Sequence, residues 1–365
     1  MPDNSEKHAV SVRDRLTQPK LERYWWLPIA VAGMVPAVLV SWLILHNNGY
    51  DPTIFLRVGI GGPRQATEIS DILGRPIPVV GGYGHDGKFF FFQAMDPLLF
   101  NPDGPASFLG RPIYRSQRIA YPFIASGGGI VPATWLPWTL LLTNIVTFSV
   151  GSVATARLAM NRGGSRWVGL VFAVNLAAIV ELGVGSGGVV ALAAAAVGIA
   201  YLDQERVAPA VVSLAVSALA REAMVLFAFG VALARWRSTG KLPLPFLWVP
   251  ASVVTWGWYV RWRIDEGSGA DEVIELSLPF VGFFEAAQRW SFEPENSINL
   301  VVALCLGMAA SIVIRRSHTT PDPLAWGATA TALMLPFFGP GRLAAVLRHL
   351  TGRGDRLVGC VGDWA

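Results

Sequence analysis

The sequence predicts an all-α polytopic membrane protein. Of its 365 residues, 53% are hydrophobic and only 15% are charged, whereas soluble domains carry about 25% charged residues. The chain also contains fourteen Trp, and Trp favours the membrane–water boundary. Long apolar stretches alternate with basic segments and with segments rich in Gly and Pro. We therefore expect about nine full or partial transmembrane helices, all within a domain at residues 24–339.

The N-terminal part predicts a first span and then a large loop. Residues 1–23 are polar and mixed in charge, and the apolar run 24–45 is about long enough to cross a bilayer. A signal peptide would have a shorter apolar core and a cleavage site soon after it. We therefore expect a retained helix, preceded by a cytoplasmic N-terminal segment at 1–23.

Residues 46–134 contain no clear span and are rich in Gly, Pro and aromatic residues. Loops of such length are uncommon unless they are functional or disordered, and the aromatic content argues against disorder. We expect a large extracytoplasmic loop with short interfacial helices. In this interpretation the Phe run at 89–92 dips into the membrane interface.

The next apolar segments predict three spans at 135–160, 167–183 and 189–202. The Gly-rich stretch 183–188 lies between the last two. We expect it to be a plain interhelical turn, because a phosphate-binding loop would continue with Gly-Lys-Ser/Thr.

Segment 207–234 is best interpreted as a hairpin. As a single helix it would be about 42 Å long, which exceeds the bilayer core of about 30 Å. It also carries Arg221-Glu222 in its middle and basic residues beyond both ends. A hairpin that turns at Arg221-Glu222 keeps both basic ends in the cytoplasm, as the positive-inside rule requires.

The C-terminal part predicts further spans at 244–262, 298–314 and 323–338, with a second, acidic outer loop at 263–297. Basic loops then fall in the cytoplasm and both long loops fall outside. The stretch 340–365 is an atypical C-terminal tail without a span. Arg far outnumbers Lys, a bias common in GC-rich bacterial genomes, so we expect a bacterial plasma membrane protein.

Two function classes are disfavoured. Nucleic-acid binding requires a water-facing basic patch with interleaved aromatic residues, whereas the basic residues here lie mostly at the ends of apolar segments. The sequence also has no CxxC motif and no Cys/His cluster that would suggest a metal site.

The stretch 81–92 is the first candidate site. Asp86 stands among glycines and precedes the Phe run. A carboxylate in an outer loop can accept a proton from a hydroxyl nucleophile, and the glycines allow close approach of a substrate. Asp-Gly is also a common turn dipeptide, so a solvated turn acid is the alternative. The neighbouring His85 could tune Asp86 or contact a phosphate group.

The second candidate cluster lies at 111–122. Arg111, Arg115 and Arg118 fall on the predicted outer side, against the positive-inside trend. Arg binds phosphate in a fork geometry, and Tyr114 and Tyr121 accompany the arginines as candidate substrate contacts. The alternative is pairing with lipid headgroups or with the acids of the second outer loop.

Arg221 and Glu222 form the third candidate site, because charges within a membrane usually face a cavity and often mark function. Arg221 could meet a lipid-linked phosphate at the hairpin turn. The alternative is an ion pair that only holds the helices together. Glu181, near the outer end of its helix, is a weaker candidate.

Three short motifs carry a family resemblance. They are His-Asp-Gly-Lys-Phe-Phe at 85–90, Tyr-Arg-Ser-Gln-Arg-Ile-Ala-Tyr-Pro at 114–122 and Ala-Arg-Glu-Ala at 220–223. In this order, and over roughly residues 24–315, the chain resembles the polytopic GT-C-type glycosyltransferases and their bacterial relatives. The resemblance implies a GT-C-like domain and a donor sugar on a polyprenyl phosphate.

The resemblance also implies residue roles. Asp86 would serve as base or as acceptor-orienting group, and Arg115, Arg118 or Arg221 would hold the donor phosphate. Asp96 or Asp103 could supply a second acid of the loop. Some such enzymes use a divalent cation, and none needs a nucleotide, because the lipid itself activates the sugar.

The sequence therefore predicts sugar transfer on the outer membrane face. Two alternatives stay open. The first is a transporter or flippase for a lipid-linked or small polar solute, which broken helices and midplane charges would favour. The second is a non-catalytic membrane subunit.

Overall fold

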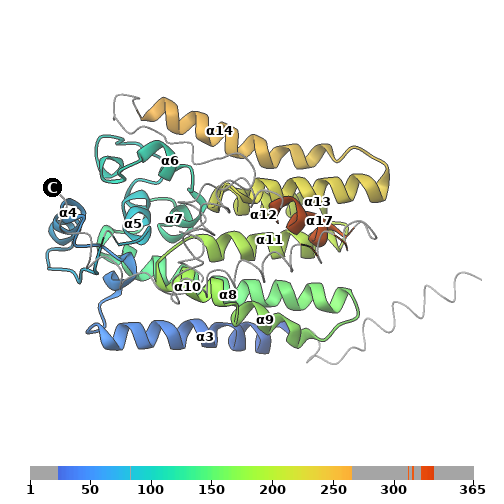
Figure 1. Ribbon diagram of the computed structural model, residues 1–365, viewed down its shortest axis with the longest axis horizontal. Coiled ribbons are helices and arrows are strands. Elements are labelled where there is room, and N and C mark those ends of the chain that lie inside the picture. Colours follow the sequence, from blue (N-terminus) through green and yellow to red (C-terminus); the bar gives the residue numbers. More distant parts are fainter. Residues whose placement is uncertain (1–23, 83, 265–310, 312–314, 316–321, 333–365) are drawn as a thin grey trace, which may run out of the picture.

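The computed structural model describes residues 24–82, 84–264, 311, 315 and 322–332. In this part of the chain the regular structure is helical, with two isolated β-bridges and no strand. The long helices lie side by side in a bundle, and the short helices gather at one end of it (Figure 1). The predicted segments 1–23, 265–297 and 340–365, and nearly all of 298–314, lie outside the described residues.

Among the described residues, two helices are long and apolar enough to cross a membrane. They are α3 (Trp26–Asn47) and the continuous helix Ala133–Asn161, made of η3 (Ala133–Trp135) and α8 (Leu136–Asn161). Both agree with the predicted spans 24–45 and 135–160. Apolar helices that could span a membrane are therefore present.

The segment of the predicted span at 167–183 is bent in the structure. It consists of η4 (Arg166–Gly169), α9 (Leu170–Ala173) and α10 (Leu176–Gly183), with a bend of 43° between the two halves. The side chain of Asn175 accepts hydrogen bonds from the backbone N–H groups of Ala177 and Ala178. This N-cap starts a new helix at that point. Counted as one bent span, the pair would be a third crossing.

Small residues bring α3 and α8 together. A Cβ atom on Gly33 of α3 would lie 2.6 Å from the side chain of Ser152 on α8. Small residues allow such close approach of helix backbones in membrane proteins. The rest of α3 exposes large apolar side chains, namely those of Leu27, Val31, Val35, Val38, Leu39, Trp42 and Leu43. The helix therefore has a packed side and an apolar side with no protein cover among the described residues.

Replacing Gly33 by Leu is expected to separate α3 from α8. Overpacking of this kind costs about 1–3 kcal/mol, so we expect a lower free energy of unfolding in detergent micelles. Val31→Leu is the matched control, because Val31 is exposed on the same helix. Equal stability of the two variants would contradict this packing.

The second half of the bundle is formed by five further described helices and by a short 3-10 segment, η5, that precedes α14. The bounds are α11 (Gly188–Leu202), α12 (Val207–Ala220), α13 (Met224–Thr239), η5 (Leu244–Leu247), α14 (Trp248–Arg263) and α17 (Pro323–Ala332). The break at residues 221–223 separates α12 from α13. An ion pair between Glu205 and Arg235 joins their far ends. The two helices therefore form the predicted hairpin.

The short helices between α3 and α8 form a cap at one end of the bundle. They are η1 (Pro52–Leu56), α4 (Pro63–Leu73), α5 (Gly87–Met95), η2 (Pro105–Phe108), α6 (Pro112–Ser116) and α7 (Ala120–Ala125). In Figure 1, α4, α6 and α7 lie around α5.

The Phe run of α5 does not face a membrane interface, so that prediction is wrong. All four Phe side chains, 89–92, are buried. Phe90 packs edge-on against Tyr121, and Phe92 stacks on Phe108 with 4.9 Å between ring centres. The neighbouring short helices cover α5 on several sides, so the aromatic rings form the core of the cap.

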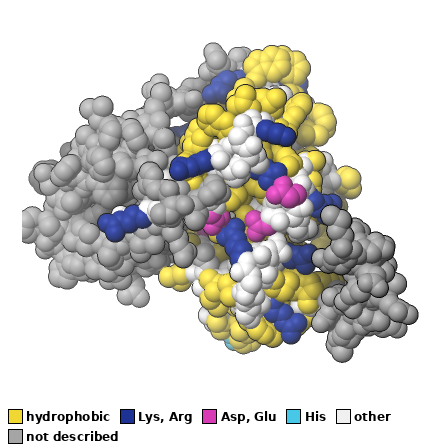
Figure 2. Space-filling view, turned by 90° about the vertical axis from the view of Figure 1, so that its right-hand side faces the viewer, with side chains coloured by type: hydrophobic (Ala, Val, Ile, Leu, Met, Phe, Trp, Pro, Cys, Tyr) yellow, Lys and Arg dark blue, Asp and Glu magenta, His cyan; other side chains and the backbone are white. Residues whose placement is uncertain are grey.

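The opposite end of the bundle is basic (Figure 2). Lys and Arg side chains gather there together with Asp and Glu side chains. Arg162, which follows α8, pairs with Asp203 at 3.6 Å and with Asp322 at 3.1 Å. These pairs, with that of Glu205 and Arg235, tie the helix ends together.

Candidate functional site

Close backbone contacts fix the loop that carries Asp86. Val58 forms a β-bridge with Gly84, and the His85 N–H donates to the Arg57 carbonyl at 2.9 Å. Gly84 has a φ of +72°, and a Cβ atom there would clash with the Arg57 carbonyl oxygen. Only glycine fits such a position. Asp86 is thereby held at the start of α5.

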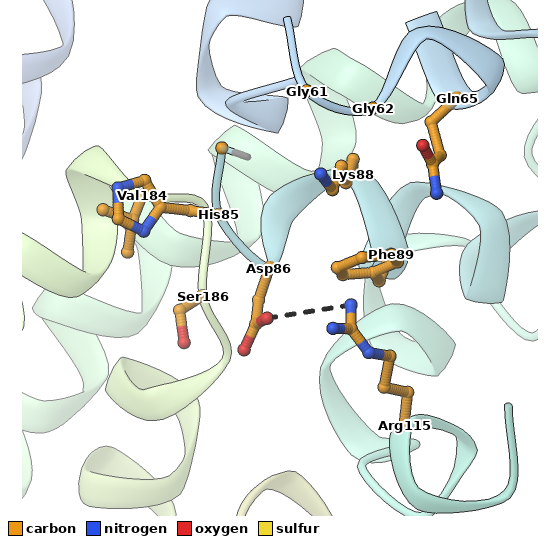
Figure 3. Close-up of a pocket in the computed structure, with 11 residues that line it drawn as sticks. Gly61, Gly62, Gln65, His85, Asp86, Lys88, Phe89, Arg115, Val184 and Ser186 are labelled. Atoms are coloured by element: carbon orange, nitrogen blue, oxygen red, sulfur yellow. Dashed lines mark ion pairs between the residues drawn. The ribbon is translucent and has the colours of Figure 1, made fainter. Parts of the chain in front are cut away.

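Asp86 lines a cavity of about 320 Å³ in the cap. The lining residues are Gly61, Gly62, Gln65, Gly84, His85, Asp86, Lys88, Phe89, Arg115, Val184 and Ser186. The Asp86 side chain is 47% exposed, so its carboxylate is accessible. Figure 3 shows Arg115 beside it, with its guanidinium directed toward the carboxylate.

Two arginines face Asp86. Its carboxylate lies 3.4 Å from the Arg118 guanidinium and 3.9 Å from that of Arg115. Arg115 also lies over the Phe89 ring, 3.1 Å from its centre. Among the described residues, the buried Nε and Nη1 atoms of Arg115 have no hydrogen-bond partner. Arg115 therefore has donors available within the cap.

Burial lowers the pKa of Arg115 to about 10, with repulsion from Arg118 and Arg111 added and attraction to Asp86 opposing. A lowered arginine pKa means that water and nearby negative charges stabilise the positive charge less than they would in solution. An anion beside Arg115 would supply that compensation.

Arg118 belongs to a separate clamp. Its Nε and Nη2 atoms donate to the two carboxylate oxygens of Glu222 at 3.0 and 2.9 Å, and Nη2 also contacts the Tyr114 hydroxyl. Burial disfavours the charge of Arg118, but Glu222, with Tyr114 and Asp86, raises its pKa above the ordinary value. The clamp ties the cap to the turn between α12 and α13.

Lys88 is a functional candidate that the sequence interpretation missed. Its side chain lines the cavity two residues after Asp86 and is only 4% exposed. Burial lowers its pKa, repulsion from Arg115 adds to this, and Asp86 opposes it. Among the described residues, Lys88, Arg115 and Arg118 lie near Asp86 and Glu222, and these five groups together carry a net positive charge. The sequence signal for Lys88 was its position two residues after Asp86 within the motif at 85–90.

The other predicted residues lie apart from the cavity. Arg221 pairs with Glu181 at 2.8 Å. Tyr121 is buried, and its hydroxyl donates to the Leu140 carbonyl at 3.0 Å. Asp96 accepts hydrogen bonds from the backbone of Phe100 and Asn101 and caps its own turn. Neither Asp96 nor Asp103 lines the cavity.

The glycine-rich turn 183–188 has a larger role than predicted. It connects α10 and α11, as expected, but it also contributes Val184 and Ser186 to the cavity. Gly185 has a φ of +65°, and a Cβ atom there would clash with the Phe55 carbonyl oxygen and lie 3.3 Å from Gly87. Sequence gave no indication of this contact, because the segments are about a hundred residues apart.

In the part of the chain that the structure describes, no group of three or more His, Cys, Asp or Glu side chains could hold a metal ion. The chain matches no family model, no curated protein and no solved structure.

Proposed function

We propose that this protein is a membrane glycosyltransferase that moves a sugar from a polyprenyl-phosphate donor to an extracytoplasmic acceptor. The observation that carries the proposal is the cavity at Asp86. An accessible carboxylate stands there beside Arg115 and Lys88, two cations within reach of an anionic ligand. A general base next to a phosphate-binding group is the arrangement that this reaction requires.

The proposed step is a displacement at the anomeric carbon of the donor sugar. Asp86 accepts the proton of the acceptor hydroxyl, and the acceptor oxygen forms a bond to the anomeric carbon. The bond from that carbon to the phosphate oxygen breaks, and its electron pair leaves with polyprenyl phosphate. The products are the glycosylated acceptor, polyprenyl phosphate and a protonated Asp86.

In this proposal Arg115 and Lys88 bind the donor phosphate. Arg118 is held by both oxygens of Glu222, so it positions the cap and has little capacity left for a ligand. Arg115 keeps buried N–H groups without a partner among the described residues. Charge-assisted hydrogen bonds from such donors to phosphate are stronger than hydrogen bonds between neutral groups.

The proposal includes a topology. About nine full or partial spans in a GT-C-like arrangement would place the N-terminus in the cytoplasm and the cap outside. This orientation is supported by the Lys and Arg side chains at the end of the bundle opposite the cap, because basic residues favour the cytoplasmic side. A donor carried in the bilayer would then reach the cavity from the outer leaflet.

The test uses the full chain in vesicles of phosphatidylethanolamine and phosphatidylglycerol. Labelled polyprenyl-phosphate hexose is added, with and without a divalent cation, and release of polyprenyl phosphate is measured for the wild type and for Asp86→Asn. Release by the wild type that is lost in the variant supports the proposal. A wild type that releases nothing overturns it and favours transport or a non-catalytic subunit.

Replacing Arg115 by Met is expected to weaken donor binding. A hydrogen bond to a charged group contributes about 1.5–3 kcal/mol, so the donor KM should rise about 10- to 100-fold. Arg64→Met is the matched control, because Arg64 stacks on Phe108 and does not line the cavity. An unchanged donor KM in Arg115→Met would remove Arg115 from the phosphate site.

One observation favours a second candidate function, transport or flipping of a lipid-linked or small polar solute. The bend between α9 and α10 and the break between α12 and α13 resemble the discontinuous helices of transporters. The same vesicles distinguish the two functions. Movement of the labelled lipid between leaflets without release of polyprenyl phosphate would favour transport.

A further inference from the structure

The glycine-rich turn 183–188 forms one wall of the cavity. In Figure 3, Asp86 stands between His85 and Ser186 on one side and Lys88 and Arg115 on the other. The two sides differ in chemistry. One carries two cations, and the other carries a hydroxyl and an imidazole.

A buried hydrogen-bond chain holds Ser186 at this wall. The Asn144 amide donates to the Ser186 carbonyl at 3.3 Å and to the Tyr121 hydroxyl at 3.1 Å. Tyr121 in turn donates to the Leu140 carbonyl at 3.0 Å. Tyr121 and Asn144 are each 1% exposed. Polar groups buried in this way are costly unless they are paired, so the chain fixes the backbone of Ser186 firmly.

Backbone packing fixes the same residue from the other side. The Ser186 N–H donates to the Glu181 carbonyl at 2.9 Å. Gly185 packs without a side chain against Phe55 and Gly87. Gly87 follows Asp86 directly in the chain, so this backbone contact places the turn next to the proposed base.

The chemistry of the two walls divides the cavity into two subsites. Cations bind an anionic group such as phosphate. A serine hydroxyl donates and accepts, and an imidazole can do both through its two nitrogens, which suits the hydroxyl groups of a sugar. A hydroxyl bound at the second wall would lie beside Asp86.

We infer that Ser186 and His85 form the acceptor subsite, which binds a neutral, hydroxyl-rich group, and that Tyr121 and Asn144 position Ser186. This inference rests on the proposed function, because it names the half of the same cavity that takes the acceptor. It also gives the glycine-rich turn and Tyr121 roles that the sequence alone did not assign.

The test compares the acceptor KM with the donor KM during transfer to methyl glycosides. Methyl glucoside, mannoside and galactoside serve as acceptor probes for the wild type and Ser186→Ala. A neutral hydrogen bond contributes about 0.5–1.5 kcal/mol, so the acceptor KM should rise about 2- to 10-fold. The donor KM should change less than the acceptor KM, because Ser186 lies on the wall of the cavity opposite Lys88 and Arg115.

Ser213→Ala is the matched control, because the Ser213 hydroxyl donates to the Pro209 carbonyl within α12 and does not line the cavity. Saturation-transfer NMR with methyl glucoside on Asp86→Asn, with and without Ser186→Ala, measures binding without turnover. An equal change of acceptor and donor KM, or no change of either, would overturn the acceptor subsite and leave the proposed transferase standing. A wild type that releases no polyprenyl phosphate would overturn both.

A double-mutant cycle tests the positioning role of Tyr121. Tyr121→Phe should raise the acceptor KM in the wild type and have little further effect in Ser186→Ala, because coupled residues are non-additive. Tyr259→Phe is the control, since its hydroxyl donates to the Leu98 carbonyl, outside this hydrogen-bond chain. Additive effects of Tyr121→Phe and Ser186→Ala would show that Tyr121 does not act through Ser186.

Discussion

Replacing Asp86 by Asn is expected to lower the rate of polyprenyl phosphate release about 10²- to 10⁴-fold, the usual contribution of a general base. Asn has nearly the shape of Asp but cannot accept the proton of the acceptor hydroxyl. The Asp86 side chain is 47% exposed, so the substitution changes little packing. The donor KM should therefore change far less than kcat.

The main alternative explanation of such a loss is a disturbed cap, because Asp86 also faces Arg115 and Arg118. Thermal unfolding of the variant in detergent micelles separates the two causes. Asp71→Asn is the matched control, since Asp71 lies on α4 and lines a different groove. Turnover at the wild-type rate in Asp86→Asn would remove Asp86 from the mechanism.

The helices of the bundle could be predicted because their signals are local. An apolar run of sufficient length predicts a span, and 24–45 and 135–160 became the helices Trp26–Asn47 and Ala133–Asn161. The hairpin at Arg221-Glu222 followed from helix length and from basic residues at both ends. The bend at Asn175 depends on a single capping side chain. One polar residue within an apolar run is too weak a signal to predict a bend.

The candidate site could be predicted only in part, because contacts between distant segments build it. Asp86 and Arg115 belong to short motifs and were found. The interfacial prediction for the Phe run was wrong because an aromatic run fits a membrane interface and a buried core equally well. Ser186 was missed because its place beside Asp86 depends on the packing of Gly185 against Gly87 and the Phe55 backbone, which no local pattern reveals.

The ion pair of Arg118 and Glu222 shows a similar limit. Both residues were candidates for substrate binding, and cross-helix pairing was the alternative for Glu222. The bidentate contact agrees with that alternative. Sequence separation of more than a hundred residues gave no means of choosing between them.

Replacing Arg118 by Met is expected to destabilise the protein by about 2–4 kcal/mol. Removing one partner of a largely buried ion pair leaves the other charge uncompensated. Here Glu222, 32% exposed at its side chain, would lose both hydrogen bonds from Arg118. The free energy of unfolding in detergent micelles measures the effect, and the cap should detach from the turn between α12 and α13.

The double variant Arg118→Met with Glu222→Met separates charge from packing. Replacing a buried ion pair by apolar residues of similar size is often neutral or stabilising, so the double variant should recover most of the lost stability. Arg75→Met is the matched control, because Arg75 forms its ion pair with Asp51 and is more exposed. Exposed pairs contribute about 0–1 kcal/mol. If Arg118→Met and Arg75→Met lose the same stability, Arg118 and Glu222 do not clamp the cap. If the stable double variant keeps its donor KM, the phosphate is bound by Arg115 and Lys88 without Arg118.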